Sequence, residues 1–348
     1  MEIKTLLSET LKAGASDLHI CVDSPPLLRV NGEIIPLKYP PLSSENTKEL
    51  IYSVLTETQR VEFEENWELD FSLHLPGISR FRVNVHRQKG NVEASIRVVS
   101  LHIPSWKELG LPPVVKDLAL KPNGLVIITG PTGMGKTTTL ASLMDLINST
   151  KRCVIISIED PIEYLHKNKK SVIKQREVRS DTHSFSQALR RVLRQDPDVI
   201  CIGEMRDLET ISTALTAAET GHLVLTTLHT PDAPQTIDRI IDVFPPHQQQ
   251  EVKIQLAGCL QGIVAQLLLP RQDGKGRILA TEILIANPGI RNVIKAHKTD
   301  QIPTLLQTGS QYGMQTMDKS LKELYLKGLI TYETAVSFSK NPTIFKNL

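Results

Sequence analysis

The feature that most constrains this chain is a glycine-rich turn between an apolar segment and a helical pattern. The apolar run 125–128 predicts a buried parallel strand, and residues 136–148 repeat apolar side chains at helical spacing. The turn between them reads Gly-Pro-Thr-Gly-Met-Gly-Lys-Thr from Gly130 to Thr137. A strand, a glycine turn and a helix N-terminus point several backbone N–H groups at one spot, where they can bind a phosphate. The sequence therefore predicts a nucleoside-triphosphate site.

Several side chains of this turn have predicted roles. Lys136 adds a positive charge at the β and γ phosphates, and the Thr137 hydroxyl is suited to Mg²⁺. A fortuitous turn is the alternative, and the flanking strand and helix disfavour it. The residues expected to contact the nucleotide are Gly130, Thr132, Gly133, Met134, Gly135, Lys136, Thr137 and Thr138.

Length and composition predict a soluble globular protein with more than one domain. The 348 residues exceed one hydrophobic core, and 40% hydrophobic with 22% charged residues is an ordinary composition. The net charge of +2, without a long basic run, argues against nucleic acid as a partner. Four widely separated cysteines predict neither a disulfide framework nor a metal site. No run of eighteen apolar residues occurs, so we expect a cytoplasmic protein that does not span a membrane.

The pattern of expected elements predicts two domains, a linker and a helical end. Residues 1–100 combine alternating strands with a helix at about 44–66, which indicates an α+β domain. Prolines and a glycine mark 101–113 as a linker. Residues 114–287 alternate strands with helices, which predicts an α/β core with a parallel sheet and ligands at its carboxyl edge. Residues 288–348 are expected to be helical. The strands expected in the core are 125–129, 153–158, 198–203, 222–227 and 277–285.

Acidic residues follow two of the expected core strands. Glu159, Asp160 and Glu163 come after one apolar run, and Glu204 comes after another. The carboxyl ends of parallel strands share one edge of a sheet, so these carboxylates should lie near the phosphate loop. We assign Glu204 to the Mg²⁺ shell and Glu163 to orienting the attacking water. Alternatively, some of these acids only cap the next element or pair with arginines.

Two histidines flank a third apolar strand. His222 precedes it and His229 follows it, and an extended chain separates them by roughly 23 Å. Both cannot touch one γ-phosphate. His229, at the carboxyl end, is the predicted phosphate sensor. His222 is left with either a packing contact or a contact to a neighbouring subunit.

Arginines lie on expected strands of the first domain. The two-residue period of a strand places Arg80 and Arg82 on one face, and Arg97 lies on a later strand. A guanidinium that reaches a γ-phosphate stabilises the charge that develops there. Exposed strand arginines are usually only solvated, so both interpretations stay open.

Four ordered motifs together resemble the secretion-type hexameric ATPases. The glycine turn and the segments 158–164, 194–207 and 220–230 are similar to that family's Walker A motif, Asp box, Walker B motif and His box. Within the superfamily the chain most resembles the type IV pilus retraction ATPases. The resemblance covers nearly the whole chain.

This resemblance implies a fold and a function. The fold is a PAS-like first domain followed by a RecA-like ATPase core. The function is that of a homohexameric motor that uses ATP and Mg²⁺ for pilus retraction and twitching motility. The family also implies docking onto an inner-membrane platform protein at the cytoplasmic face, and first-domain arginines that reach the nucleotide as the domains close. The catalytic residues expected are Glu163, Glu204, His229, His222, Arg82 and Arg97.

One departure from the family keeps alternatives open. Residues 289–296 look like the family's retraction signature but end in Lys295 and Ala296, where the signature ends in arginine and glutamate. The chain is thus either a retraction motor or an auxiliary paralogue. An assembly ATPase of pili or type II secretion is the nearest rival, although such proteins usually carry a four-cysteine zinc motif. A DNA-translocating motor and a non-catalytic nucleotide-gated scaffold are further alternatives.

Overall fold

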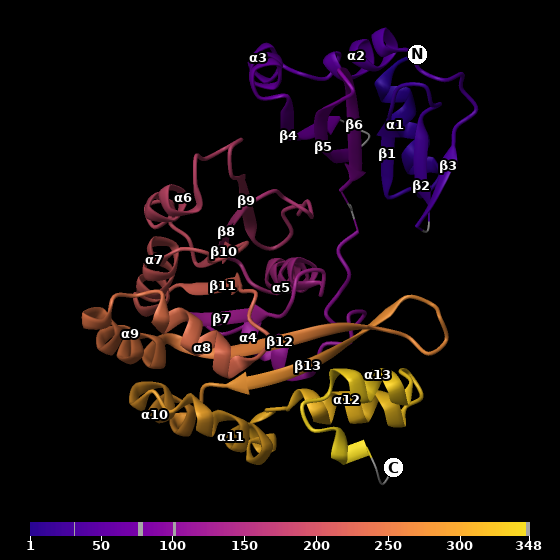
Figure 1. Cartoon of the computed structure of the whole chain (residues 1–348). Helices are drawn as coiled ribbons and strands as arrows, with labels where there is room; N and C mark the ends of the chain where they lie inside the picture. The colour runs from indigo at the N-terminus through magenta and orange to yellow at the C-terminus, as the bar shows by residue number, and fades with distance from the viewer. Residues whose placement is uncertain (31, 76–78, 100–101, 346–348) are drawn as a thin grey trace. The chain divides into compact units, whose positions relative to one another are not determined.

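The computed structural model describes residues 1–30, 32–75, 79–99 and 102–345, and it divides into two compact units (Figure 1). The first unit comprises Met1–His102 with Glu163–Leu165, and the second comprises Ile103–Ile162 with His166–Leu348. Residues 103–112, within the expected linker, contain no helix or strand and group with the second unit.

In its described residues the first unit has an antiparallel six-stranded sheet and three helices, and the α+β prediction for it is confirmed. The strand order is β3-β2-β1-β6-β5-β4. Alternate residues of β5, Phe81, Val83 and Val85, are buried and pack in one core with Leu6 and Leu7 of α1. The pair Asn31-Gly32 predicts a hairpin turn, and Asn31 lies outside the described residues. The elements are α1 Ile3–Lys12, β1 Asp17–Ile20, β2 Leu27–Val30, β3 Glu33–Pro36, α2 Ser44–Tyr52, α3 Glu57–Asn66, β4 Glu68–Leu75, β5 Ser79–Gln88 and β6 Asn91–Val98.

The single helix predicted over 44–66 is wrong, because two helices occupy this stretch. Helix α2 ends at Tyr52 and α3 begins at Glu57. Between them Thr56 is extended, and its side chain accepts a hydrogen bond from the backbone N–H of Gln59. The Gln59 side chain in turn accepts from the N–H of Thr56. Such a capping box starts a new helix.

The second unit is built on a seven-stranded sheet in the order β13-β12-β7-β11-β10-β8-β9 (Figure 1). All neighbouring pairs from β12 to β9 are parallel, but β13 is antiparallel to β12. The prediction of a parallel strand at 277–285 is therefore wrong in direction. Only Arg271–Gly276 connects β12 to β13, and a connection this short cannot make a parallel crossover. The strands are β7 Gly124–Thr129, β8 Val154–Glu159, β9 Val172–Glu177, β10 Val199–Ile202, β11 Leu223–Thr227, β12 Leu260–Pro270 and β13 Arg277–Ile285.

Helices cover both faces of this sheet, which confirms the α/β prediction for the core. Along β7, Leu125 and Ile127 pack into one core cluster, whereas Val126 and Ile128 pack into another with residues of α4 and α5. Burial on both faces explains the unbroken apolar run. No helix among the described residues is long and apolar enough to cross a bilayer. The helices are α4 Pro113–Ala119, α5 Lys136–Thr150, α6 Phe185–Val192, α7 Leu208–Glu219, α8 Ala233–Asp242, α9 Pro246–Cys259, α10 Pro288–Ala296, α11 Ile302–Thr308, α12 Met317–Leu326 and α13 Tyr332–Phe338.

Candidate active site

The glycine turn between β7 and α5 forms an open backbone cradle. Gly130, Gly133 and Gly135 have φ values of 140°, 79° and 78°, which favour glycine over other residues. A Cβ atom at Gly130 would lie 2.4 Å from the carbonyl oxygen of Gln266, so no side chain fits there. Gly135 is the N-cap of α5 and no side chain caps the helix. The first N–H groups of α5 are therefore suited to an anion.

Strand β12 holds this loop from one side. The Gln266 side chain, 1% exposed, donates from Nε2 to the carbonyl oxygen of Met134 at 2.6 Å. The N–H of Leu268 contacts the sulfur of Met134 at 3.2 Å. Neither Gln266 nor Leu268 was predicted from the sequence, because β12 itself was not predicted. The apolar residues on both sides of Gln266, at 263–265 and 267–269, were the signal that could have found the strand.

The lysine of the loop is buried and held by carbonyl groups. Lys136 is 7% exposed, and its Nζ donates to the carbonyl oxygens of Gly130 at 2.8 Å and Pro131 at 2.9 Å. Burial lowers the pKa of Lys136, and the negative charge of Glu204 opposes this shift. A phosphate beside this ammonium would restore the stabilisation that burial removes.

His229 links the lysine to an acid. Its Nδ1 lies 3.3 Å from Lys136 Nζ and 3.4 Å from the hydroxyl of Thr132. Its Nε2 lies 3.1 Å from Oε1 of Glu204. A lysine ammonium only donates and a carboxylate only accepts, so we assign Nδ1 as the acceptor and Nε2–H as the donor. The imidazole thus bridges the phosphate loop and the end of β10.

Glu204 is an ionised carboxylate at the carboxyl end of β10. Burial raises its pKa, but hydrogen bonds from Arg206 and His229 and the charge of Arg206 lower it by more, so the pKa ends below its ordinary value. The Arg206 Nε lies 2.8 Å from Glu204 Oε1. The sequence analysis did not assign Arg206 a role, although it lies inside the motif that contains Glu204.

Threonines fix the strand ends that carry these groups. The hydroxyl of Thr129, at the end of β7, donates to the carbonyl oxygen of Thr230 at 2.6 Å. The hydroxyl of Thr227 donates to the carbonyl oxygen of Gly203 at 2.5 Å. Each bond ties neighbouring strands together beside a site residue, either His229 or Glu204.

Two residues that the sequence suggested for the site, His222 and Glu159, have contacts elsewhere in the second unit. His222 precedes β11 at the amino end, and its Nδ1 lies 3.0 Å from the carbonyl oxygen of Ala217. The structure does not bring it to the phosphate loop. Glu159 is 8% exposed and accepts hydrogen bonds from Ser157 at 2.6 Å and Gln175 at 3.0 Å.

Three further predicted residues, Arg82, Arg97 and Glu163, belong to the first unit. Arg82 on β5 and Arg97 on β6 are directly opposite each other, and Arg97 Nε donates to Asp17 at 2.8 Å. Glu163 groups with this unit too. Burial raises the pKa of Asp17, but hydrogen bonds from Ser16 and Arg97 outweigh that effect and leave the pKa below its ordinary value. The roles of Glu163, Arg82 and Arg97 at a nucleotide stay predictions.

Known proteins resemble this chain over nearly its whole length. A family model described as type II/IV secretion system protein matches residues 1–335. The Pseudomonas aeruginosa type IV pilus retraction ATPase PilT is 48% identical and covers 99% of this chain and 100% of its own length. The type IV pilus ATPase PilU of that organism is 44% identical over 97% of this chain and 88% of its own. A crystal structure of the pilus retraction motor PilT with bound ADP has a TM-score of 0.94, 50% identity and full coverage of both chains.

Proposed function

The chain belongs to the type II/IV secretion system protein family, and on that premise we propose that it is an ATP-hydrolysing motor that drives the retraction of type IV pili. One observation supports ATP hydrolysis best: the contacts from Lys136 through His229 to Glu204. They connect the group that would bind a terminal phosphate to a carboxylate that follows β10, which lies two strands from β7 in the sheet. A glycine turn without chemistry would not need this connection.

The cradle has N–H groups suited to a nucleotide phosphate, and oxygen ligands suited to Mg²⁺ lie in the site. Gly130 leaves no room for a side chain, and the start of α5 is free of a side-chain cap. The Thr137 hydroxyl and the Glu204 carboxylate are hard oxygen ligands of the kind that Mg²⁺ prefers, so these residues would hold the ion. When bound, Mg²⁺ neutralises charge on the phosphate oxygens.

The surrounding side chains would respond to the terminal phosphate. Lys136 would exchange the Gly130 and Pro131 carbonyls for phosphate oxygens, because a charged acceptor forms the stronger hydrogen bond. His229 would then lose the hydrogen bond that its Nδ1 accepts from Lys136. Because its Nε2 contacts Glu204, this change would couple phosphate binding to Glu204. Following the family resemblance, we assign Glu163 to the attacking water, and Arg82 with Arg97 to the charge that develops on the phosphate.

The motor would act as a ring of six copies at the cytoplasmic face of the inner membrane. The resemblance supports docking onto a platform protein at the pilus base. Neither role requires a membrane-spanning segment in this chain. Domain rotation that follows ATP binding and product release would supply the movement.

An auxiliary role beside another retraction motor is a second candidate. The end of α10 carries Lys295 and Ala296, both exposed, where the retraction signature has other residues. Arg291 of the same helix is retained, and it donates to the carbonyl oxygen of Gly258 at 2.7 Å at the end of α9. The contact between α10 and the end of α9 is thus retained, whereas the two exposed residues that end the signature differ.

Deleting the gene and counting surface pili tests the direction of force. A retraction motor predicts more pili per cell, and the wild-type gene, but not a Lys136→Ala copy, restores the normal number. Fewer pili would indicate assembly and contradict the proposal. An unchanged number, with normal retraction by a second motor, would favour the auxiliary role. Phosphate release by the purified chain at saturating ATP is measured in parallel, and its absence would favour a scaffold.

A further inference from the structure

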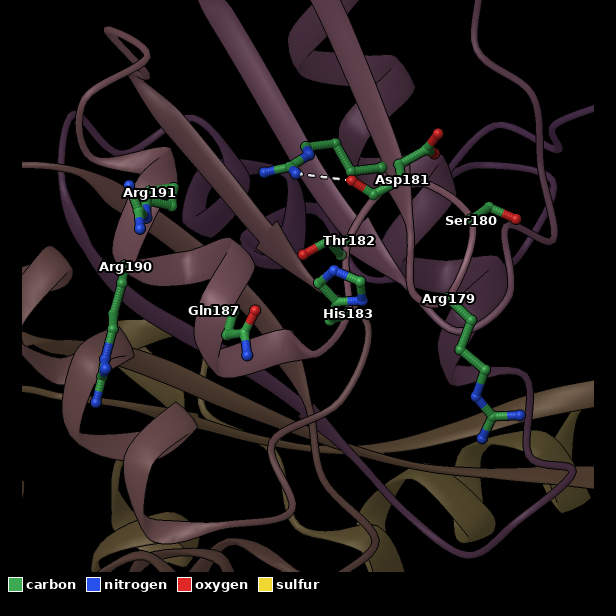
Figure 2. Close-up of a pocket in the computed structure, with 9 residues that line it drawn as sticks. Arg179, Ser180, Asp181, Thr182, His183, Gln187, Arg190 and Arg191 are labelled. Atoms are coloured by element: carbon green, nitrogen blue, oxygen red, sulfur yellow. Dashed lines mark hydrogen bonds between the residues drawn. The ribbon is translucent and has the colours of Figure 1, made fainter.

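A cavity lined by arginines lies at the end of the edge strand β9. Its volume is about 640 Å³, and its lining comes from Arg176 at the end of β9, from the following loop and from α6 (Figure 2). Three more arginines line it, Arg179, Arg190 and Arg191, together with His183. We call this cavity the arginine pocket. Cavities of this size commonly hold small molecules.

The positive charge of the arginine pocket is largely uncompensated. Arg190 forms an ion pair with Glu209, but in the part of the chain that the structure describes, Arg179 and Arg191 form no ion pair. Asp181 is the one acidic residue in the lining, and its Oδ2 accepts a hydrogen bond from the N–H of Glu177 at 2.8 Å. Side chains on one short segment therefore leave a net positive cavity.

One guanidinium of the arginine pocket is left with an unused buried donor. Nη2 of Arg176 donates to the carbonyl oxygen of Asp181 at 2.9 Å, shown as the dashed line in Figure 2. Its Nη1 is buried and has no hydrogen-bond partner among the described residues. A buried donor without a partner costs free energy, and a side-chain rotation that turned Nη1 to an anion in the cavity would remove that cost.

The arginine pocket is separate from the phosphate loop. Both lie at the carboxyl edge of one sheet, but four strand spacings separate β7 from β9 in the order β7-β11-β10-β8-β9. At about 4.8 Å per spacing, this is roughly 19 Å. A ligand in the arginine pocket would leave the phosphate loop free.

We propose that the arginine pocket is a second anion site that binds a phosphate ester. Guanidinium groups match phosphate oxygens in pairs of parallel hydrogen bonds, and a cavity rimmed by several of them suits more than one phosphate group. Figure 2 shows His183 and Gln187 between Arg179 and Arg190, where they can supply further polar contacts. The phosphate belongs either to a soluble ester or to an anionic lipid headgroup.

Binding of inorganic pyrophosphate to the full-length chain tests the proposal. Every variant carries Lys136→Ala, which removes the lysine of the phosphate loop. We expect about one pyrophosphate per chain by equilibrium dialysis, and binding weaker by tenfold or more when Arg179→Gln and Arg191→Gln are added. Both arginines are exposed and unpaired in the described structure, so the melting temperature should not change. Arg152→Gln, an exposed arginine outside the pocket, is the matched control and should bind normally.

Vesicles identify the source of the phosphate. Phosphatidylcholine vesicles with and without phosphatidylglycerol are sedimented with the same proteins. Pocket-dependent binding to the anionic vesicles alone indicates a lipid headgroup, whereas binding of pyrophosphate without vesicle binding indicates a soluble ester. Equal pyrophosphate affinity with and without the two pocket substitutions overturns the proposal. No pyrophosphate binding, together with a changed oligomeric mass in the pocket variant, also overturns it and assigns the arginines to a subunit contact.

Discussion

The two ends of strand β11 carry the same residue type in different chemical surroundings. At the carboxyl end, His229 contacts Lys136, Thr132 and Glu204 through both ring nitrogens. At the amino end, the His222 side chain is hydrogen-bonded to the end of α7, through the Ala217 carbonyl and the Thr220 hydroxyl. In a parallel sheet the carboxyl edge gathers loops from several strands, and those loops bring unlike groups together. A histidine's position along the strand, more than its identity, therefore determines what it can do.

The largest expected effect follows from removing the acid at the carboxyl end. Glu204→Gln keeps the size of the side chain but removes the charge that pairs with Arg206 and His229. We expect kcat for ATP hydrolysis to fall on the order of 10³-fold with nucleotide binding retained. Steady-state phosphate release checks this, with the exposed Glu251→Gln as a control of equal charge change. Normal turnover by Glu204→Gln would show that this carboxylate is not needed for ATP hydrolysis.

The second test compares the ends of β11 directly. His229→Ala breaks the link between Lys136 and Glu204 but leaves both groups in place. We expect kcat to fall about 10²-fold, within the range found for groups positioned at a reacting phosphate or proton. A fall of the same size in His222→Ala would contradict the comparison. The two variants should be assayed at the same saturating ATP concentration.

The sequence predicted the residues that meet at strand ends better than those that arrive from elsewhere. Glu204 and His229 each follow an apolar run, and parallel strands place such residues beside the phosphate loop. Gln266 lies in the middle of β12 and contacts the phosphate loop. The local sequence does not show which loop a polar residue in the middle of a strand will contact. The side chain of Arg206 is 69% exposed, and its contribution to the site is an ion pair with Glu204 that depends on the fold.

Errors in the predicted fold have similar causes. The break between α2 and α3 depends on a side-chain cap at Thr56, which hydrophobic periodicity does not detect. The direction of β13 depends on its connection to β12, a strand that was not predicted from the sequence. Local patterns thus predicted element types well, whereas direction and contact depended on neighbours distant in the sequence.

His166 extends the comparison of histidines, because its side chain is buried and lies at neither end of β11. The His166 side chain is 1% exposed, with Asp145 4.0 Å away, and burial lowers its pKa to about 4. The unfolded chain takes up a proton below its ordinary pKa of 6.5, which the folded chain does not, so stability present above pH 6.5 is lost as the pH falls toward 4. We expect His166 to account for a loss of about 2 kcal/mol between pH 7 and pH 5. Urea unfolding of wild type and His166→Gln checks this, since only the wild type carries that part of the pH dependence.

The smallest expected effect concerns the amino end of β11. His222 donates from Nδ1 to the carbonyl oxygen of Ala217, so His222→Ala removes one hydrogen bond at the end of α7 and should lower the free energy of unfolding by about 1 kcal/mol. Turnover by the isolated chain should stay within about twofold of wild type, because no phosphate contact is lost. His222→Asn, which retains a donor, should recover part of the stability. Loss of turnover in both variants at unchanged stability would instead place His222 in the catalytic machinery.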